Sequence, residues 1–192
     1  PAQDLARVEA VRDALGPSGK VRVDANGGWD VDTAVRMVRS LDRFGLEYVE
    51  QPCATLEELA EVRRRVDVPV AADESIRRAE DPLRVRAALR VAEACGLPVV
   101  VSSAVETSVG LAAGVALAAA LPDLPHACGL ATGQMLTADV TADPLLPLDG
   151  FLPVRPVAVD EESLRAVEVD PAGWRARAEA ARAAADEVSG TG

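Results

Sequence analysis

The feature that most constrains the fold is a repeat in which a short apolar run ends in a carboxylate and a helix-like stretch follows. Three such runs cover residues 21–24, 48–50 and 68–73, and a fourth run at 97–103 ends in two serines. The three terminal acids lie 26 and 23 residues apart in the chain. Strands and helices that alternate at this interval predict parallel βα units, which build either an open doubly wound sheet or a closed barrel.

Helix signals fill the intervals between these runs. Thr55 and Glu58 form a capping-box pattern before an apolar periodic stretch, and Asp32 is a candidate N-cap for the preceding helix. The remaining predicted elements are helices over 86–94 and 110–121 and a weaker strand over 126–130.

The chain changes character after residue 142. Prolines punctuate an extended segment over 151–159, and Asp170-Pro171 then opens a helix that is predicted to reach about residue 188. We interpret residues 1–142 as part of a β/α barrel and residues 143–192 as a C-terminal extended segment and helix packed outside the repeat.

The composition narrows the classes of function. Hydrophobic residues make up 49% of the chain and aromatic residues only 3%, which favours an aliphatic core of parallel strands covered by helices. A formal net charge of −11 would repel nucleic-acid phosphates and anionic lipid. Three cysteines without a CxxC pair favour reduced thiols, and no apolar stretch reaches membrane-spanning length. These features predict a cytoplasmic protein that binds neither nucleic acid nor membrane, and none of them indicates an oligomeric state.

The acids that end the three strands, Asp24, Glu50 and Asp73, are the candidate functional residues. The carboxyl ends of neighbouring parallel strands share one rim, so these side chains are expected to converge. Crowded carboxylates repel one another unless a cation neutralises them, and oxygen ligands suit a hard cation such as Mg²⁺. Any one of these acids could instead cap the following helix, but three in consecutive units favour a metal site.

The residues around these acids resemble a known family. The stretches 22–27 (RVDANG), 48–52 (YVEQP) and 71–75 (AADES) are similar to the three metal-ligand motifs of the enolase superfamily, in its order and at its spacing. The stretch 102–110 resembles the muconate-lactonizing subgroup. Further similarity to the actinobacterial o-succinylbenzoate synthase family lies in residues 129–132, 136–140 and 143–146.

The resemblance implies a (β/α) barrel of the enolase type, with the C-terminal tail packing toward a smaller capping domain. It implies that Asp24, Glu50 and Asp73 bind Mg²⁺, for which Mn²⁺ could substitute. The residues implied to support these ligands are Asn26, Gln51 and Glu74, and those implied to face the substrate are Ser102 and Ser103.

The implied reaction is the loss of water from a succinyl-hydroxycyclohexadiene carboxylate, which gives o-succinylbenzoate for menaquinone biosynthesis. The cation would hold the carboxylate of this small-molecule substrate and stabilise the enediolate that forms when an α-proton leaves. An N-succinylamino acid racemase or dipeptide epimerase on the same scaffold would share these residues and is an alternative.

The chain departs from the family at the two lysines that serve as acid and base. Its single lysine, Lys20, precedes the strand that ends in Asp24 and so belongs to the opposite end of a barrel. About one βα unit, with the second lysine, is missing near residues 85/86. We expect the chain to be part of a longer protein, and a non-catalytic remnant domain is the alternative. His126 and Cys53 are interpreted as structural.

Overall fold

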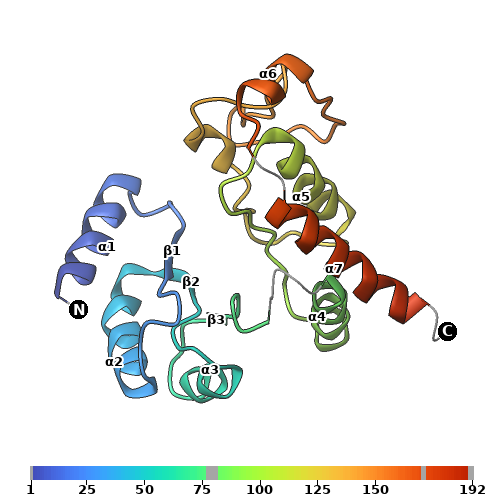
Figure 1. Cartoon of the computed structure of the whole chain (residues 1–192). Coiled ribbons are helices and arrows are strands. Elements are labelled where there is room, and N and C mark those ends of the chain that lie inside the picture. Colours follow the sequence, from blue (N-terminus) through green and yellow to red (C-terminus); the bar gives the residue numbers. More distant parts are fainter. Residues whose placement is uncertain (1, 77–81, 170–171, 190–192) are drawn as a thin grey trace. The chain divides into compact units, whose positions relative to one another are not determined.

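The structure is a computed structural model that describes residues 2–76, 82–169 and 172–189. The chain forms two compact units (Figure 1). The first unit is residues 1–86 with 183–192, and the second unit is residues 87–182. The elements in chain order are α1 Ala2–Leu15, β1 Val21–Asp24, α2 Val31–Leu41, η1 Asp42–Phe44, β2 Leu46–Glu50, α3 Leu56–Arg63, β3 Val70–Ala71, α4 Pro82–Cys95, α5 Ser108–Ala120, η2 Thr132–Met135, α6 Glu161–Ala166 and α7 Ala172–Ser189.

The strands of the first unit form one parallel sheet in the order β1-β2-β3. The first two predicted strands are confirmed. The third, predicted over 68–73, is confirmed only over β3, because the chain turns beyond Ala71. In this turn the Ile76 N–H bonds back to the Asp73 carbonyl at 3.0 Å. The acid that was expected to end the third strand therefore lies two residues beyond it.

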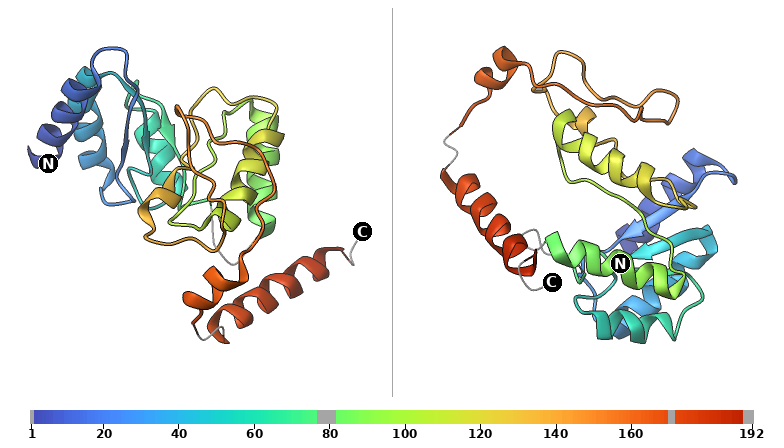
Figure 2. Two further views of the ribbon diagram at one scale, coloured as in Figure 1. Left: turned by 90° about the horizontal axis from the view of Figure 1, so that it is seen from above. Right: turned by 90° about the vertical axis from the view of Figure 1, so that its right-hand side faces the viewer.

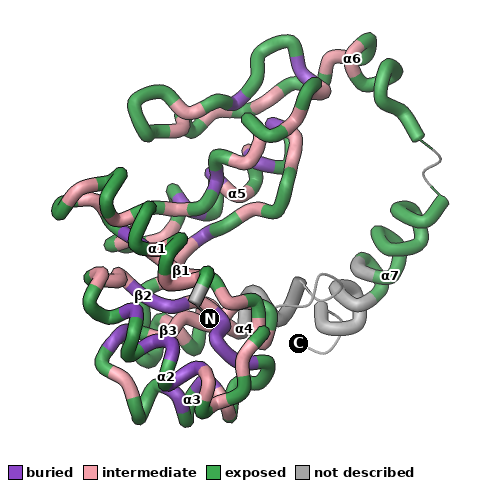
Figure 3. Tube along the Cα trace, turned by 90° about the vertical axis from the view of Figure 1, so that its left-hand side faces the viewer, coloured by how far each residue is buried: buried purple, intermediate pink, exposed green. Residues whose placement is uncertain are grey.

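Helices α2 and α3 cover one face of this sheet through an aliphatic core. Val38 of α2 packs with Val49 of β2 and with Val68, and Val38 and Val49 are fully buried. Figure 3 marks the buried stretches of α2, β2 and α3 in purple, and Figure 2 shows the same elements from two other sides. Because side chains alternate along a strand, the neighbouring residue Glu50 projects from the sheet face that the helices leave open.

The N-terminus of α2 is capped by Asp30, whose carboxylate accepts a hydrogen bond from the Thr33 N–H at 2.7 Å. This hydrogen bond lowers the pKa of Asp30. The prediction of Asp32 as the cap is wrong, because Asp32 already lies in the first helical turn. Asp30 has the extended backbone that a capping residue requires.

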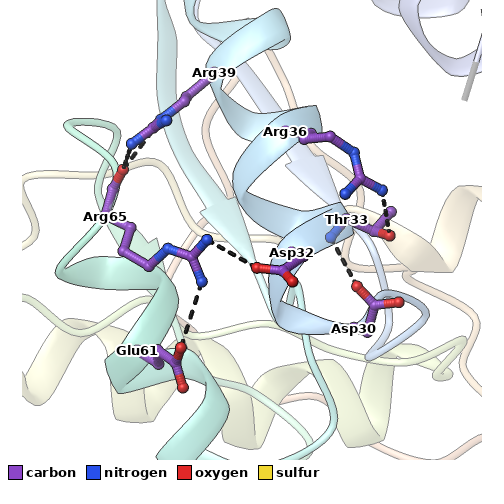
Figure 4. A network of polar contacts seen from close by, with 7 residues as sticks. All are labelled: Asp30, Asp32, Thr33, Arg36, Arg39, Glu61 and Arg65. Atoms are coloured by element: carbon purple, nitrogen blue, oxygen red, sulfur yellow. Dashed lines mark hydrogen bonds and ion pairs between the residues drawn. The ribbon is translucent and has the colours of Figure 1, made fainter.

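Asp32 instead takes part in a surface network that joins α2 to the end of α3 (Figure 4). Arg65 lies 2.8 Å from Asp32 and 3.4 Å from Glu61, while its carbonyl accepts two hydrogen bonds from Arg39. These groups are exposed, so the network contributes modestly to stability and mainly fixes the approach of the two helices.

The capping box predicted at the start of α3 is confirmed. Thr55 Oγ1 accepts from the Glu58 N–H at 3.3 Å, and the Glu58 carboxylate accepts from the Thr55 N–H at 3.0 Å. We expect Thr55→Ala to lower the free energy of unfolding by about 1 kcal/mol, because the Glu58 N–H loses its acceptor. Urea denaturation followed by circular dichroism measures this change. Glu57→Ala, an exposed change in the same turn, should cost less than about 0.5 kcal/mol, and equal losses would contradict the capping role.

The sequence pattern does not predict α1, whose inward face is only half-buried and carries Leu5, Val8 and Arg12. Arg12 joins this helix to the turns that precede β1 and β2. Its guanidinium donates to four backbone carbonyls, those of Phe44 at 2.8 Å, Gly45 at 3.2 Å, Gly16 at 2.9 Å and Gly19 at 2.7 Å.

We expect Arg12→Met to lower the free energy of unfolding by about 2 kcal/mol, because it keeps the aliphatic stem and removes the donors of several charge-assisted hydrogen bonds. Arg7→Met is the matched control: Arg7 lies on the same helix, its side chain is 75% exposed, and it pairs only at the surface with Asp4. Chemical denaturation should give the control a loss below about 0.5 kcal/mol. A similar loss from both variants would rule out the proposed role of Arg12.

The second unit is built around α5, which confirms the predicted helix at 110–121 and begins two residues earlier. Its core combines residues of α5 with residues of the segments before and after it: Val101, Leu111, Val115, Ala118, Leu130 and Leu145. In Figure 2 the chain after α5 runs as irregular yellow and orange loops before α6. Ordered packing in this unit therefore depends on loops more than on sheet.

The predicted strands at 97–103 and 126–130 are wrong in extent, since the structure forms only one parallel bridge between them, at Ser102 and Gly129. The Gly129 N–H bonds to the Val101 carbonyl and the Ser103 N–H to the Gly129 carbonyl, both at 2.9 Å. Because these two hydrogen bonds make up a single bridge, neither segment extends into a strand. The predicted extended segment at 151–159 is confirmed as non-helical backbone with a single bridge from Phe151 to Leu148.

The helix predicted over 86–94 is confirmed as part of α4, which begins earlier, at Pro82. α4 runs without a break across residues 85/86 and ends before Gly96. α7 confirms the predicted C-terminal helix, although residues 170–171 lie outside the described residues. Within the part of the chain that the structure describes, no helix is both long and apolar enough to cross a membrane.

Candidate metal centre

Two of the candidate ligands, Asp24 and Glu50, end adjacent strands in register. Their α-carbons are paired partners in the β1-β2 ladder, so both side chains project from the same face of the sheet. This is the face opposite Val49 and α2. Asp24 is exposed and Glu50 is half-buried. Adjacent parallel strands are about 4.8 Å apart, which brings the two carboxylates within the span of one coordination sphere.

The backbone pairing continues past the strand ends into the loops. The N–H groups of Ala25, Gly27 and Trp29 donate at 3.1, 2.7 and 3.2 Å to successive carbonyls, the first at the end of β2 and the other two in the loop that follows it. Asn26 and Gly27 have φ values of 48° and 69°. At Gly27 an added Cβ would meet the backbone of Ala54 at 3.4 Å, an ordinary contact distance, so it is the left-handed backbone that favours glycine.

Asp24 is itself held by this turn. Its Oδ1 accepts a hydrogen bond from the Asn26 N–H at 2.8 Å, which fixes the carboxylate at the strand end. Asn26 therefore supports Asp24 through its backbone, and its own side chain is exposed.

The third candidate, Asp73, is fixed by Gln51. The Gln51 Oε1 accepts from the Asp73 N–H at 2.7 Å and from the Ser75 hydroxyl at 3.0 Å. Its Nε2 donates to the Cys53 carbonyl at 2.8 Å. No sequence pattern singles out Ser75, because a serine in a turn has many local roles. Glu74, between the two donors, is exposed.

The donor set suits a hard divalent cation, since it consists of carboxylate oxygens on neighbouring strand ends. The structure brings together the backbone positions of the three acids. Within the described ranges, no group of three or more His, Cys, Asp or Glu side chains is gathered closely enough to hold a metal ion. The rim thus sets the acids side by side, and rotation of their side chains would have to complete a coordination sphere.

Below the acids on the same sheet face lies an ion pair. Arg22 donates to Glu47 at 2.6 Å, and its guanidinium lies 4.8 Å from the centre of the Tyr48 ring. Burial raises the pKa of Tyr48, so its hydroxyl stays protonated at neutral pH. Arg22 and Glu47 offset each other's charge directly beneath the rim.

Cys53, close to this centre, is structural, and Lys20 lies too far from it to take part in its chemistry. Cys53 is fully buried, and burial together with the negative charge of Glu58 raises the pKa of its thiol. A protonated, buried thiol is a poor ligand and nucleophile. Lys20 directly precedes β1 and so lies at the opposite end of that strand from Asp24, about 13 Å away for four residues of strand.

The predicted substrate-facing serines belong to the second unit. Ser102 is exposed, whereas Ser103 is half-buried and its hydroxyl contacts the Gly129 carbonyl at 3.2 Å and Thr132 Oγ1 at 2.8 Å. His126 is half-buried three residues before the Gly129 bridge. These contacts account for Ser103 as a loop brace and leave Ser102 as the more accessible hydroxyl.

This arrangement matches known proteins. Residues 1–85 match the model of a family described as Enolase C-terminal domain-like. The structure is similar to the crystal structure of muconate cycloisomerase from Pseudomonas fluorescens, with a TM-score of 0.77 and 28% identity, over 85% of this chain and 54% of that one. Residues 1–85 thus match the C-terminal domain of the enolase superfamily, and the fold of the chain is similar to part of that superfamily's β/α barrel.

Within the superfamily, the chain is similar to the o-succinylbenzoate synthases. It is 70% identical to the o-succinylbenzoate synthase of Thermobifida fusca (strain YX) over 206 residues, covering 97% of this chain and 65% of the relative. A second solved structure, an enolase from Thermobispora bispora DSM 43833 complexed with magnesium and formate, is 28% identical with a TM-score of 0.73. That similarity covers 86% of this chain and 46% of that one. The chain thus spans about two thirds of the relative and about half of each solved chain.

The alignment with the T. fusca relative holds more positions than this chain fills. Since 97% of 192 residues is about 186 residues, about 20 of the 206 aligned positions are residues of the relative without a counterpart here. These positions lie inside the aligned span. The relative therefore has about 20 more residues than this chain within the aligned span.

Proposed function

We propose that this chain forms the metal-binding part of a Mg²⁺-dependent lyase that forms o-succinylbenzoate from a succinyl-hydroxycyclohexadiene carboxylate, in menaquinone biosynthesis. The observation that carries the proposal is the in-register pairing of Asp24 with Glu50 on the open face of the sheet, next to a tethered Asp73. The 70% identity to an o-succinylbenzoate synthase supports the choice of reaction.

Asp24, Glu50 and Asp73 would hold the cation, with Mg²⁺ as the resident ion and Mn²⁺ as a substitute. A divalent cation supplies electrostatic stabilisation of the negative charge that develops on a substrate carboxylate when an α-proton leaves. The chain's own residues hold the site in place: Gln51 fixes the loop of Asp73, the Asn26 N–H fixes Asp24, and Glu74 lies beside Asp73. Ser102 and Ser103 would contact the substrate.

The acid and base that the resemblance implies are lysines, and no lysine of this chain lies at the rim. Its single lysine, Lys20, precedes β1, at the end away from the acids. We assign the acid and base to segments that the longer relatives carry and this chain lacks. One of them is a βα unit missing near residues 85/86, which the surplus of about 20 aligned positions in the T. fusca relative supports.

Peptide mapping of the protein from its native source tests the missing unit. Cleavage after glutamate should yield no peptide with the printed sequence of residues 81–93, because extra residues interrupt it. Recovery of that peptide, DPLRVRAALRVAE, as the only product from this region would overturn the proposal.

Assays of the full encoded protein test the reaction. With Mg²⁺ we expect the dehydration to o-succinylbenzoate, followed by the absorbance of the aromatic product, and its loss on chelation with EDTA. Rapid racemisation of N-succinylamino acids or epimerisation of dipeptides without dehydration would favour the alternative isomerases. Mg²⁺ binding without either activity would favour a non-catalytic remnant.

The domain arrangement and location belong to the same proposal. Residues 1–142 would contribute to the barrel, and residues 143–192, with α6 and α7, would pack toward a capping domain. The substrate would be a small-molecule carboxylate, with no role for nucleic acid or membrane, and the protein would act in the cytoplasm. The net charge of −11 supports the exclusion of phosphate-rich partners.

A further inference from the structure

We propose that Gln51 is a positioning residue that places the Asp73 carboxylate for the cation. The proposal rests on the metal centre proposed above. It attributes the fixed position of the third ligand, Asp73, to the side-chain amide of Gln51. Gln51 acts through the backbone of the turn that carries Asp73.

The three acids differ in how the sheet holds them. Asp24 and Glu50 are strand residues whose backbones are fixed by the β1-β2 ladder. β3 has only two residues, and its pairing to β2 ends at Ala71. Asp73 therefore lies beyond the ladder, and the Gln51 side chain takes the place of the missing inter-strand bond by accepting from the Asp73 N–H at 2.7 Å.

The backbone and side chain of Gln51 are held in the conformation that makes this contact. Gln51 is 1% exposed, and its φ of 37° lies in the left-handed region, which non-glycine residues rarely adopt. Such backbone conformations persist where surrounding contacts determine them and gather at functional sites. Here both ends of the amide are engaged, with Oε1 on the turn of Asp73 and Ser75 and Nε2 on the Cys53 carbonyl.

A purely structural role is the competing explanation, because any buried amide needs partners. The two explanations differ in what a substitution changes. If Gln51 only satisfies buried groups, its loss lowers stability and leaves the affinity of the folded protein for a cation unchanged. If it positions Asp73, its loss weakens cation binding beyond what an equally destabilising core change does.

The test measures Mn²⁺ affinity by electron paramagnetic resonance and exchange of the Asp73 amide by hydrogen–deuterium exchange, in the complete chain. Gln51→Leu should weaken Mn²⁺ binding by about 10–100-fold, the usual range for residues that orient metal ligands, and should speed exchange of the Asp73 amide. Gln51→Glu keeps acceptor oxygens for the Asp73 N–H, although it loses the donor to the Cys53 carbonyl, and should therefore keep exchange of the Asp73 amide slow. Val62→Ala, a fully buried core change in α3, should lower stability and leave Mn²⁺ affinity within about twofold.

The outcomes separate this proposal from the metal centre itself. If Asp73→Asn abolishes Mn²⁺ binding while Gln51→Leu stays within twofold of the unmodified chain, the positioning role is wrong and the centre stands. If Asp73→Asn leaves binding intact, the metal centre and the positioning role both fail. If Gln51→Leu does not fold, Gln51→Glu decides, because fast exchange of the Asp73 amide in that variant contradicts the acceptor role.

Discussion

Replacing any one of Asp24, Glu50 and Asp73 with its amide should weaken Mg²⁺ or Mn²⁺ binding by at least about 100-fold, more than the 10–100-fold usual for a residue that only supports a ligand. The amide keeps the shape of the side chain and removes the charge that a hard cation requires. In the complete protein, the same changes should abolish turnover. Isothermal titration calorimetry and Mn²⁺ resonance measure the binding directly, independently of any reaction.

Asp67→Asn is the matched control for this series. Asp67 is an exposed acid of the same unit, three residues before β3 and therefore toward the opposite end of that strand from Asp73. It removes the same charge without touching the rim, so its binding constant should stay within about twofold of the unmodified chain, as screening of exposed charges implies. Near-normal affinity in any of the three rim variants would exclude that acid as a ligand.

The second large effect is expected in the second unit, where Asp139→Ala should lower stability by about 3 kcal/mol, since several charge-assisted hydrogen bonds are lost at once. The Asp139 carboxylate accepts from the N–H and hydroxyl of Ser108, at the start of α5, and from the Val140 N–H. Ser108 is fully buried, and its hydroxyl oxygen accepts in turn from the Leu145 N–H at 2.7 Å. Removing the carboxylate therefore leaves buried donors unsatisfied at the point where the loop after η2 joins α5.

Hydrogen–deuterium exchange should show the effect of Asp139→Ala as faster exchange at the Ser108 and Leu145 amides, together with a lower midpoint of chemical denaturation. Asp143→Ala is the control: its carboxylate pairs with Arg155 at 3.0 Å, but its side chain is 80% exposed. That variant should lose less than about 0.5 kcal/mol. Similar losses from the two aspartates would show that Asp139 does not organise the loop.

The sequence predicted those parts of the first unit that depend on local signals. The apolar runs ending in Asp24 and Glu50 became β1 and β2, and the Thr55 capping box formed as expected. The cap of α2 was misassigned because Asp30 and Asp32 both suit the start of a helix, and only the backbone decides between them. α1 escaped prediction because its attachment depends on Arg12 and distant carbonyls of the turn before β2.

The second unit was less predictable because its contacts are not local. Strand signals at 97–103 and 126–130 were present, yet a strand extends only where partners continue the ladder, and these two segments share a single bridge at Ser102. At the candidate site, the side-by-side placement of Asp24 and Glu50 followed from their spacing. The hydrogen bond from the Asp73 N–H to Gln51 could not be predicted, because it depends on a left-handed φ at Gln51 that no sequence pattern indicates.

The ladder that continues from β1 and β2 into their loops has a thermodynamic consequence. Fixing the backbone of one residue costs about 1–2 kcal/mol of conformational entropy. In the loop after β1, Ala25, Gly27 and Trp29 are already fixed by hydrogen bonds to the end of β2 and the loop that follows it, so that entropy is lost when the chain folds. Because this loop is already ordered, binding of a small ion at the rim should order few further residues. Calorimetry should therefore show a small entropic penalty for ion binding.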